Sequence, residues 1–358
     1  MKNTVFFCGN GNHPLGAQVL KKLSELFGES CKFDHINFNK FPEGELDNRI
    51  PQWQKINGKT VVLFQSFNDK DFLELILETL DLIWALKHQY NAERIIVIFS
   101  FMCNRRQDSI MEIDPNNLWK KPKPDEFQRL RMTISLLSHC GVSEIIVPTP
   151  HSKAMEEACK EYNIIFHEID LSGLFADALK TFVSEQELNL VNMYAPDLGS
   201  IPRAVNIAKI LNCTVLFNLK NRVIYNKTSI KEEGEEKLEE IAKSFREKYN
   251  FPKIYYVTSK LVAGKIMALV EDEIASGGTA NNTGQMLKKL NSKYNLLFAT
   301  HAVFTRGWRN QLFYENPFAK IIITDSIERP YEKRTGGQLV DILIAPVVAS
   351  TLFKILRS

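Results

Sequence analysis

Residues 265–279 read KIMALVEDEIASGGT, and this stretch predicts a buried strand that leads through a tight turn into a helix. The strand is an apolar run that ends in two adjacent acids, Glu271 and Asp272. The residues that follow, 275–278, are all small, and Thr279 opens the helix. Strands without polar alternation are typical of parallel sheets with both faces covered by helices. The stretch therefore favours an α/β fold.

The turn at 275–279 has the composition of an anion site. Glycines let backbone N–H groups approach a phosphate, and a helix N-terminus adds positive partial charge. The hydroxyls of Ser276 and Thr279 can donate to phosphate oxygens, and the preceding acids can accept from sugar hydroxyls. On these residues alone, an ordinary strand–turn–helix capped by Thr279 remains an alternative. The sequence contains no GxxxxGK[ST] pattern, which disfavours a P-loop kinase.

The rest of the chain repeats the same alternation of apolar runs and helical patterns, which predicts doubly wound α/β units. Ten strands are many for one sheet, so we expect two sheets. Strands are expected at 4–8, 60–65, 94–99, 144–148, 190–195, 214–218, 254–257, 265–270, 296–302 and 320–324. Helices are expected at 14–27, 71–88, 127–139, 152–162, 201–211 and 279–291, with a charged amphipathic helix at 231–249 and a surface loop at 114–125.

Composition excludes several classes of protein. The 358 residues, 44% hydrophobic and 24% charged, are typical of a globular chain of two domains at ~150 residues each. The net charge of +3 argues against a nucleic-acid or membrane-surface role. The six cysteines form no CxxC pair, which indicates buried thiols in a reducing compartment. With no apolar run near the ~18 residues of a membrane span, we expect a cytoplasmic protein.

The segment 270–279, VEDEIASGGT, resembles the phosphoribosyl-pyrophosphate loop of type I phosphoribosyltransferases and of ribose-phosphate pyrophosphokinases, whose form is roughly VDDxIDTGGT. Seven further segments, in the same order along the chain, resemble the pyrophosphokinases specifically. Where the family's form differs, it is given in parentheses. The segments are FPEGE at 41–45 (FxDGE), RQD at 106–108, TPHS at 149–152 (DLHA), PDLGS at 196–200 with Arg203 (PDxGG), KNR at 220–222 (KRR), TH at 300–301 and TDSI at 324–327.

The resemblance implies two phosphoribosyltransferase-like α/β domains, each a largely parallel sheet flanked by helices. They would span 1–160 and 161–339, with 340–358 able to pack back on the first. It also implies Mg²⁺-dependent transfer of pyrophosphate from ATP to ribose 5-phosphate, in a homo-oligomer. The implied catalytic residues are Lys220 and Arg222, and the metal ligands are His151 and Asp197. The implied ATP-binding residues are Phe41, Glu43, Glu45, Arg106, Gln107 and Asp108. Those for ribose 5-phosphate are Glu271, Asp272, Ala275, Ser276, Gly277, Gly278 and Thr279.

Each segment also has a purely structural alternative when taken singly. Phe41–Glu45 fits a solvated turn, Arg106 and Asp108 fit a surface ion pair, and Asp197 fits a cap on the helix that begins near Ile201. The functional interpretation is favoured because the seven segments occur jointly and in order.

The chain departs from the family pattern at Glu43, Thr149, Asn221, Glu271 and Ala275, which marks it as divergent. Ala275 removes an acid from the loop and favours a second hypothesis, a non-catalytic relative. The retained Lys220, Arg222, His151 and Asp197 argue against it. A third hypothesis is a type I phosphoribosyltransferase, in which 41–45 and 106–108 have no role.

Overall fold

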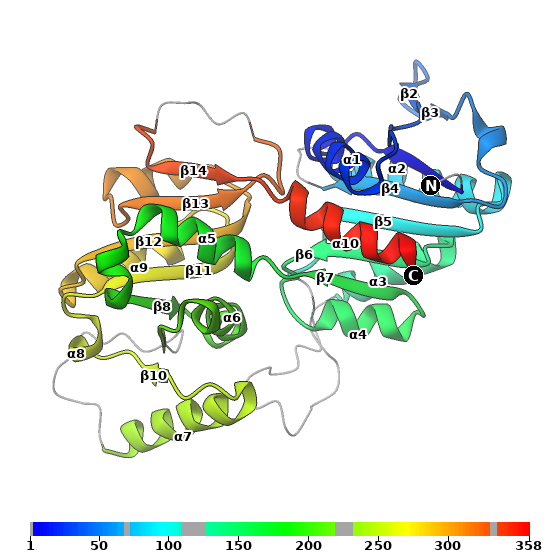
Figure 1. The fold of residues 1–358 in the computed structure, drawn as a ribbon. Coiled ribbons are helices and arrows are strands. Elements are labelled where there is room, and N and C mark those ends of the chain that lie inside the picture. Colours follow the sequence, from blue (N-terminus) through cyan, green and yellow to red (C-terminus); the bar gives the residue numbers. More distant parts are fainter. Residues whose placement is uncertain (1–2, 68–71, 107, 109–126, 219–231, 330–334) are drawn as a thin grey trace. The chain divides into compact units, whose positions relative to one another are not determined.

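The computed structural model describes residues 3–67, 72–106, 108, 127–218, 232–329 and 335–358, which divide into two compact units (Figure 1). The first unit consists of Met1–Asp170, Asp325–Glu328 and Leu343–Ser358, and the second of Leu171–Thr324 and Arg329–Ile342. Each unit contains a parallel sheet flanked by helices, so the expected α/β class with two sheets is confirmed. The expected first boundary, at residue 160, lies before β7 (Ile165–Ile169), and β7 pairs with β6 (Glu144–Pro148) inside the first unit.

The described part of the first unit contains a five-stranded sheet whose neighbours all pair in parallel. Its order is β1 (Thr4–Cys8), β4 (Thr60–Ser66), β5 (Arg94–Phe101), β6 (Glu144–Pro148) and β7. Neighbouring side chains point to opposite faces, and both faces are buried, as Leu63 and Phe64 illustrate. The long apolar runs of the sequence are explained by this double burial.

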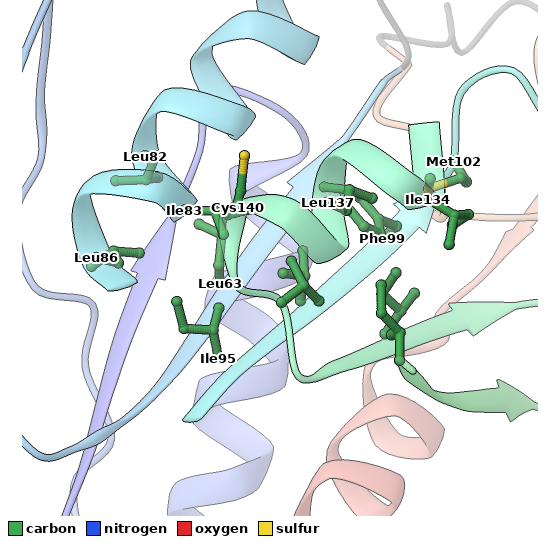
Figure 2. Close-up of a cluster of buried hydrophobic side chains, with 14 of the residues drawn as sticks. Leu63, Leu82, Ile83, Leu86, Ile95, Phe99, Met102, Ile134, Leu137 and Cys140 are labelled. Atoms are coloured by element: carbon green, nitrogen blue, oxygen red, sulfur yellow. The ribbon is translucent and has the colours of Figure 1, made fainter. Parts of the chain in front are cut away.

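Helices cover both faces of this sheet. One face packs against α2 (Phe72–Trp84) with its π-helical extension η2 (Ala85–Gln89), α3 (Arg129–Cys140) and α4 (Ala154–Glu161). Figure 2 shows Leu63, Ile95 and Phe99 of the sheet beneath Ile83 and Leu137 of the helices. The other face packs against α1 (His13–Phe27) and the C-terminal α10 (Ala345–Arg357), whose contact includes the rings of Phe27 and Phe353, 4.6 Å apart.

An antiparallel hairpin of β2 (Asn37–Lys40) and β3 (Leu46–Arg49) separates α1 from β4 and precedes the short η1 (Trp53–Lys55). The Phe41 amide closes its turn by donating to the Glu45 carbonyl at 2.8 Å. The hairpin therefore holds the 41–45 segment as a defined turn.

The described part of the second unit contains a seven-stranded sheet whose neighbours also pair in parallel. Its order is β10 (Ile254–Tyr256), β9 (Thr214–Phe217), β8 (Val191–Ala195), β11 (Ile266–Ile274), β12 (Tyr294–Ala302), β13 (Lys320–Thr324) and β14 (Leu339–Ile342). From β8 the chain moves outward to β10, then returns to β11 and proceeds in the opposite direction. The direction reverses between β8 and β11, and in open α/β sheets ligands bind at the strand carboxyl ends beside such a reversal.

The helices of the second unit cover both faces of its sheet. On one face lie α5 (Ser172–Phe182) and α6 (Ile201–Leu211), and Phe175 meets Phe298 of β12 at 5.6 Å. On the other lies α9 (Gly278–Lys289). The remaining elements are α7 (Glu232–Tyr249) beside β10, α8 (Ser259–Val262) and the short η3 (Glu185–Leu190), η4 (Leu198–Ser200) and η5 (Asn310–Tyr314). Over the residues that the structure describes, helices long and apolar enough to span a bilayer are absent.

A buried carboxylate joins three strands of the first unit near their amino ends. Glu144 of β6 is 3% exposed and binds Arg94 of β5 and, at 2.7 Å, His167 of β7. Burial raises the pKa of the Glu144 carboxyl, but hydrogen bonds and charge from His167 and Arg94 outweigh it, so the net pKa lies below the usual range. Such a group stabilises the fold above its unfolded pKa, and the contribution is lost as pH falls through the folded pKa.

Replacing Glu144 by Gln should lower the free energy of unfolding by about 2 kcal/mol at pH 7, because hydrogen bonds to a charged group are lost. The difference from wild type should shrink as pH falls below 4.5, where the carboxylate takes up a proton. Urea denaturation of both proteins, at pH 7 and at a pH below 4.5, measures this difference in the free energy of unfolding. Glu93→Gln, at an exposed neighbouring position, is the control, and an equal effect of the two changes would contradict the assignment.

Candidate functional site

Gly277 determines the shape of the loop between β11 and α9. It adopts φ +82° and forms the N-cap of α9. A Cβ added there would lie 3.0 Å from Cγ of Leu312, so both the backbone conformation and the space favour glycine. The first amides of α9 have no acceptor within the helix. The loop therefore presents N–H donors and the positive end of the helix dipole at the carboxyl edge of the sheet.

The acids before this loop lie inside the strand rather than after it, which corrects the expected strand end at residue 270. β11 continues to Ile274, with Glu271 and Glu273 in register with β12. Successive strand side chains point to opposite faces, so Glu271 and Asp272 are separated by the sheet. Asp272 is 8% exposed and lies 3.9 Å from Nη2 of Arg203 on α6. That contact keeps a buried carboxylate paired with a cation near the loop.

Asp197 follows β8 and is held by a reciprocal cap at η4. Its Oδ1 accepts the Ser200 amide at 3.0 Å, and the Ser200 hydroxyl donates to the Asp197 carbonyl at 2.8 Å. The capping role considered from the sequence is therefore present, and it also orients the carboxylate. Because β8 and β11 are neighbours, Asp197, Arg203 and Asp272 gather at the reversal in strand order. Ser200 was not singled out from the sequence, although DLGS has capping-box spacing.

Two further segments that resemble the family are internal. Thr300 and His301 lie on β12 and are at most 1% exposed, and the Thr324 hydroxyl donates to the Thr300 carbonyl at 2.7 Å. Asp325 accepts the Ile344 amide at 2.9 Å, and burial raises the pKa of its carboxyl. These residues act in packing and chain connection.

In the first unit the expected ATP-binding residues lie in two places. Phe41, Glu43 and Glu45 occupy the β2–β3 turn, where Phe41 is 43% exposed. Arg106 and Asp108 follow β5, and Asp108 accepts a hydrogen bond from the Ser152 hydroxyl, one residue beyond His151. This bond links the segments that follow the neighbouring strands β5 and β6. Gln107 lies outside the described residues.

The backbone at Thr149 is strained. This buried residue follows β6 with φ +46°, a conformation that β-branched residues rarely adopt. Left-handed backbone costs an L-residue about 1–2 kcal/mol. Such outliers cluster where a segment must be held in one conformation, and here the segment leads to His151.

The donor set suits Mg²⁺ only in part. Mg²⁺ usually takes one or two carboxylates and completes its octahedron with water and substrate phosphates. The oriented carboxylate of Asp197 fits that role, and the imidazole of His151 is a less usual donor. Within the described ranges no three His, Cys, Asp or Glu side chains gather around a metal position. A magnesium ion would thus depend on substrate oxygens. His151 and Asp197 belong to different units, so their sharing one ion stays a prediction.

The catalytic pair expected from the sequence, Lys220 and Arg222, lies outside the described residues. It follows β9 along the chain, the neighbour of β8 in the sheet. Its role stays a prediction.

Replacing Gly277 by Ala should lower the free energy of unfolding by about 1 kcal/mol or more, because alanine at positive φ is strained and its Cβ meets Leu312. Gly278→Ala is the matched control, since a Cβ there lies 3.7 Å from the Ser276 hydroxyl oxygen, an ordinary contact. Thermal and urea unfolding of both variants give the comparison. Equal stability of the two variants would show that the loop does not require the left-handed glycine.

Known proteins resemble this chain along most of its length. Residues 4–115 match the N-terminal domain of ribose phosphate pyrophosphokinase. The chain is 24% identical to a ribose-phosphate pyrophosphokinase of Fusobacterium nucleatum, over 93% of this chain and 89% of that protein. It is 25% identical to one of Methanobrevibacter smithii, over 84% and 86% of the two chains.

A solved structure shows the same fold. The crystal structure of phosphoribosylpyrophosphate synthetase from Mycobacterium smegmatis superposes with a TM-score of 0.74 and 20% identity, covering 99% of both chains. The agreement extends through both units.

Proposed function

Because the chain is a divergent member of the ribose-phosphate pyrophosphokinase family, we propose that it transfers the pyrophosphoryl group of ATP to ribose 5-phosphate. The C1 hydroxyl is the acceptor, and the products are 5-phosphoribosyl 1-pyrophosphate and AMP. The observation that carries the proposal is the first turn of α9, whose amides have no acceptor within the helix and which the Gly277 cap places at the reversal in strand order. This is where an α/β sheet binds an anionic ligand.

The loop supplies the ribose 5-phosphate site. Backbone amides at Gly278 and Thr279, with the Ser276 and Thr279 hydroxyls, bind the phosphate. Asp272, which lies beside Arg203 near the loop, accepts from ribose hydroxyls, whereas Glu271 points to the opposite face of the sheet. Arg203 places a positive charge 3.9 Å from the Asp272 carboxylate. The same loop therefore distinguishes a phosphorylated sugar from a neutral one.

ATP and the transferred group are bound by other segments. The 41–45 turn and the 106–108 segment bind the nucleotide, and Lys220 with Arg222 neutralises the charge that develops on phosphate oxygens. When bound, Mg²⁺ would supply further neutralisation of the ATP phosphates, and His151 and Asp197 are each proposed as a magnesium ligand. The Asp108–Ser152 hydrogen bond ties the nucleotide segment to the His151 segment.

A non-catalytic relative is the second candidate, since Ala275 removes an acid from the phosphate loop. One assay separates the candidates: purified protein with ATP, ribose 5-phosphate and Mg²⁺, followed for AMP and phosphoribosyl pyrophosphate. The proposal predicts equal amounts of both products. Substrate binding without AMP release would favour the non-catalytic relative. Consumption of added phosphoribosyl pyrophosphate only with a base present would indicate a phosphoribosyltransferase.

We also propose a homo-oligomer in the cytoplasm. The packed neighbours α2 and α3 expose apolar side chains, with Leu73 and Leu77 at 64% and 58% and Met132 at 54%. These exposed apolar side chains on neighbouring helices support the proposal, with a second copy of the chain as the occupant. The cytoplasmic location follows the expectation from cysteine usage.

Lys220→Ala and Arg222→Ala should each lower turnover by about 10²-fold or more, because each removes a donor to transition-state charge. Circular dichroism and unfolding midpoints should match wild type. Asn221→Ala, between the two, is the matched control and should retain activity. Near-full activity of either cationic variant would overturn the assignment.

Thr149→Asp should lower the Mg²⁺ concentration needed for half-maximal activity, because it adds a negative charge close to His151. Thr149→Asn is the isosteric control. Asn and Asp both tolerate left-handed backbone better than Thr, so the difference between the two variants reports the charge alone. A Mg²⁺ titration with identical midpoints for Asp and Asn would refute the idea.

A further inference from the structure

A second segment forms a wall beside the phosphate loop. Beyond the end of β12, the Phe304 amide donates to the Ile274 carbonyl at 2.9 Å, and the Thr305 amide donates to the Ala275 carbonyl at 3.1 Å. These bonds continue the pairing of β11 and β12 past the strands and into the loop itself. Residues 303–309, here called the β12 wall, therefore lie directly against the start of the anion site.

The β12 wall is held rigidly. Phe304 adopts φ +46°, and its ring stacks on Trp308 with centroids 3.8 Å apart and planes 3° apart. The Trp308 amide donates to the Thr305 carbonyl at 3.2 Å, which closes a tight turn around residues 306–307. Arg329 fixes the start of the wall by donating from Nη2 to the Val303 carbonyl at 2.8 Å.

The segment after the wall contacts the loop again. Leu312 lies where a side chain on Gly277 would be. The Asn281 side-chain amide on α9 donates to Oε1 of Gln311 at 3.1 Å. Contacts at the start of the β12 wall and in the segment just after it thus set the position of the wall relative to residues 274–281.

Arg306 is an exposed residue in the turn between Thr305 and Trp308. It follows Thr305, whose amide binds the loop carbonyl at Ala275. Among the described residues its guanidinium has no ion-pair or hydrogen-bond partner. Arg309 differs, because its guanidinium lies over the Trp308 ring at 4.9 Å. The neighbouring loop residue, Ala275, offers no carboxylate to compete for Arg306.

We propose that Arg306 is a further substrate-binding residue, whose guanidinium binds the phosphate group of the sugar phosphate held by residues 275–279. A guanidinium presents a planar fork of donors that matches phosphate oxygens bidentately, and such charge-assisted bonds are stronger than neutral ones. The inference rests on the proposed function and adds a side-chain cation to a site otherwise built from backbone amides and hydroxyls. Arg306 thereby increases the preference for a phosphorylated ribose.

Calorimetric titration of the full chain with ribose 5-phosphate tests this. Arg306→Ala should weaken binding by roughly 10- to 100-fold, the loss expected for a hydrogen bond to a charged group, and Arg306→Lys should restore part of it. Affinity for ATP and the unfolding midpoint should stay at their wild-type values. Lys243→Ala, an exposed change on α7, is the control for loss of one positive charge and should bind as wild type does.

The outcomes separate this inference from the proposed function. Wild-type protein that fails to bind ribose 5-phosphate would overturn both. Wild-type binding with equal affinity in Arg306→Ala would overturn only the role of Arg306. A loss of ATP affinity in place of ribose 5-phosphate affinity, or a loss matched by Lys243→Ala, would also overturn it.

Discussion

The backbone amides at the start of α9, which have no acceptor within the helix, are the constraint on which the rest of this site depends. Their direction depends on the path of the preceding loop, which the left-handed Gly277 sets as it packs against Leu312. The reversal of strand order between β8 and β11 then places Asp197 and Arg203 beside the same loop. The left-handed backbone at Gly277 and the reversal of strand order between β8 and β11 thus define one candidate anion site.

Charged side chains of both signs surround the loop at residues 275–279. Asp272 is paired with Arg203 on the face of α6, and Asp197 is capped by Ser200. Ala275 contributes no acid, and Arg306 enters from the β12 wall with no acceptor among the described residues. A site that lacks one carboxylate and has a cation beside it binds anions more strongly by Coulomb attraction. Ala275, in place of the family's acid, therefore changes the net charge around the loop but leaves the backbone amides of the candidate anion site in place.

The sequence predicted the parts of the fold that local pattern specifies. Central strands such as β4 and β5 were recognised because both of their faces are buried and their runs are uninterrupted. The edge strands β7 and β14 were missed because polar residues interrupt their short apolar runs, IFHEI and LVDI, and most of their side chains are only partly buried. The end of β11 was misplaced because pairing with β12 carries acids that local propensity would exclude. α10 was not assigned, and its partner α1 lies at the other end of the chain.

The residues of the candidate site were likewise predictable only in part from the sequence. The loop at 275–279 could be found because its glycines and hydroxyls are contiguous, whereas Ser152 and Arg306 could not, since their relevance arises from contacts made only in the fold. The central claim is that the first turn of α9 holds the phosphate of ribose 5-phosphate. A crystal structure of the complex tests it most directly. The account predicts the phosphate within hydrogen-bond distance of the amides of residues 277–279, and a sugar phosphate bound away from this loop would contradict it.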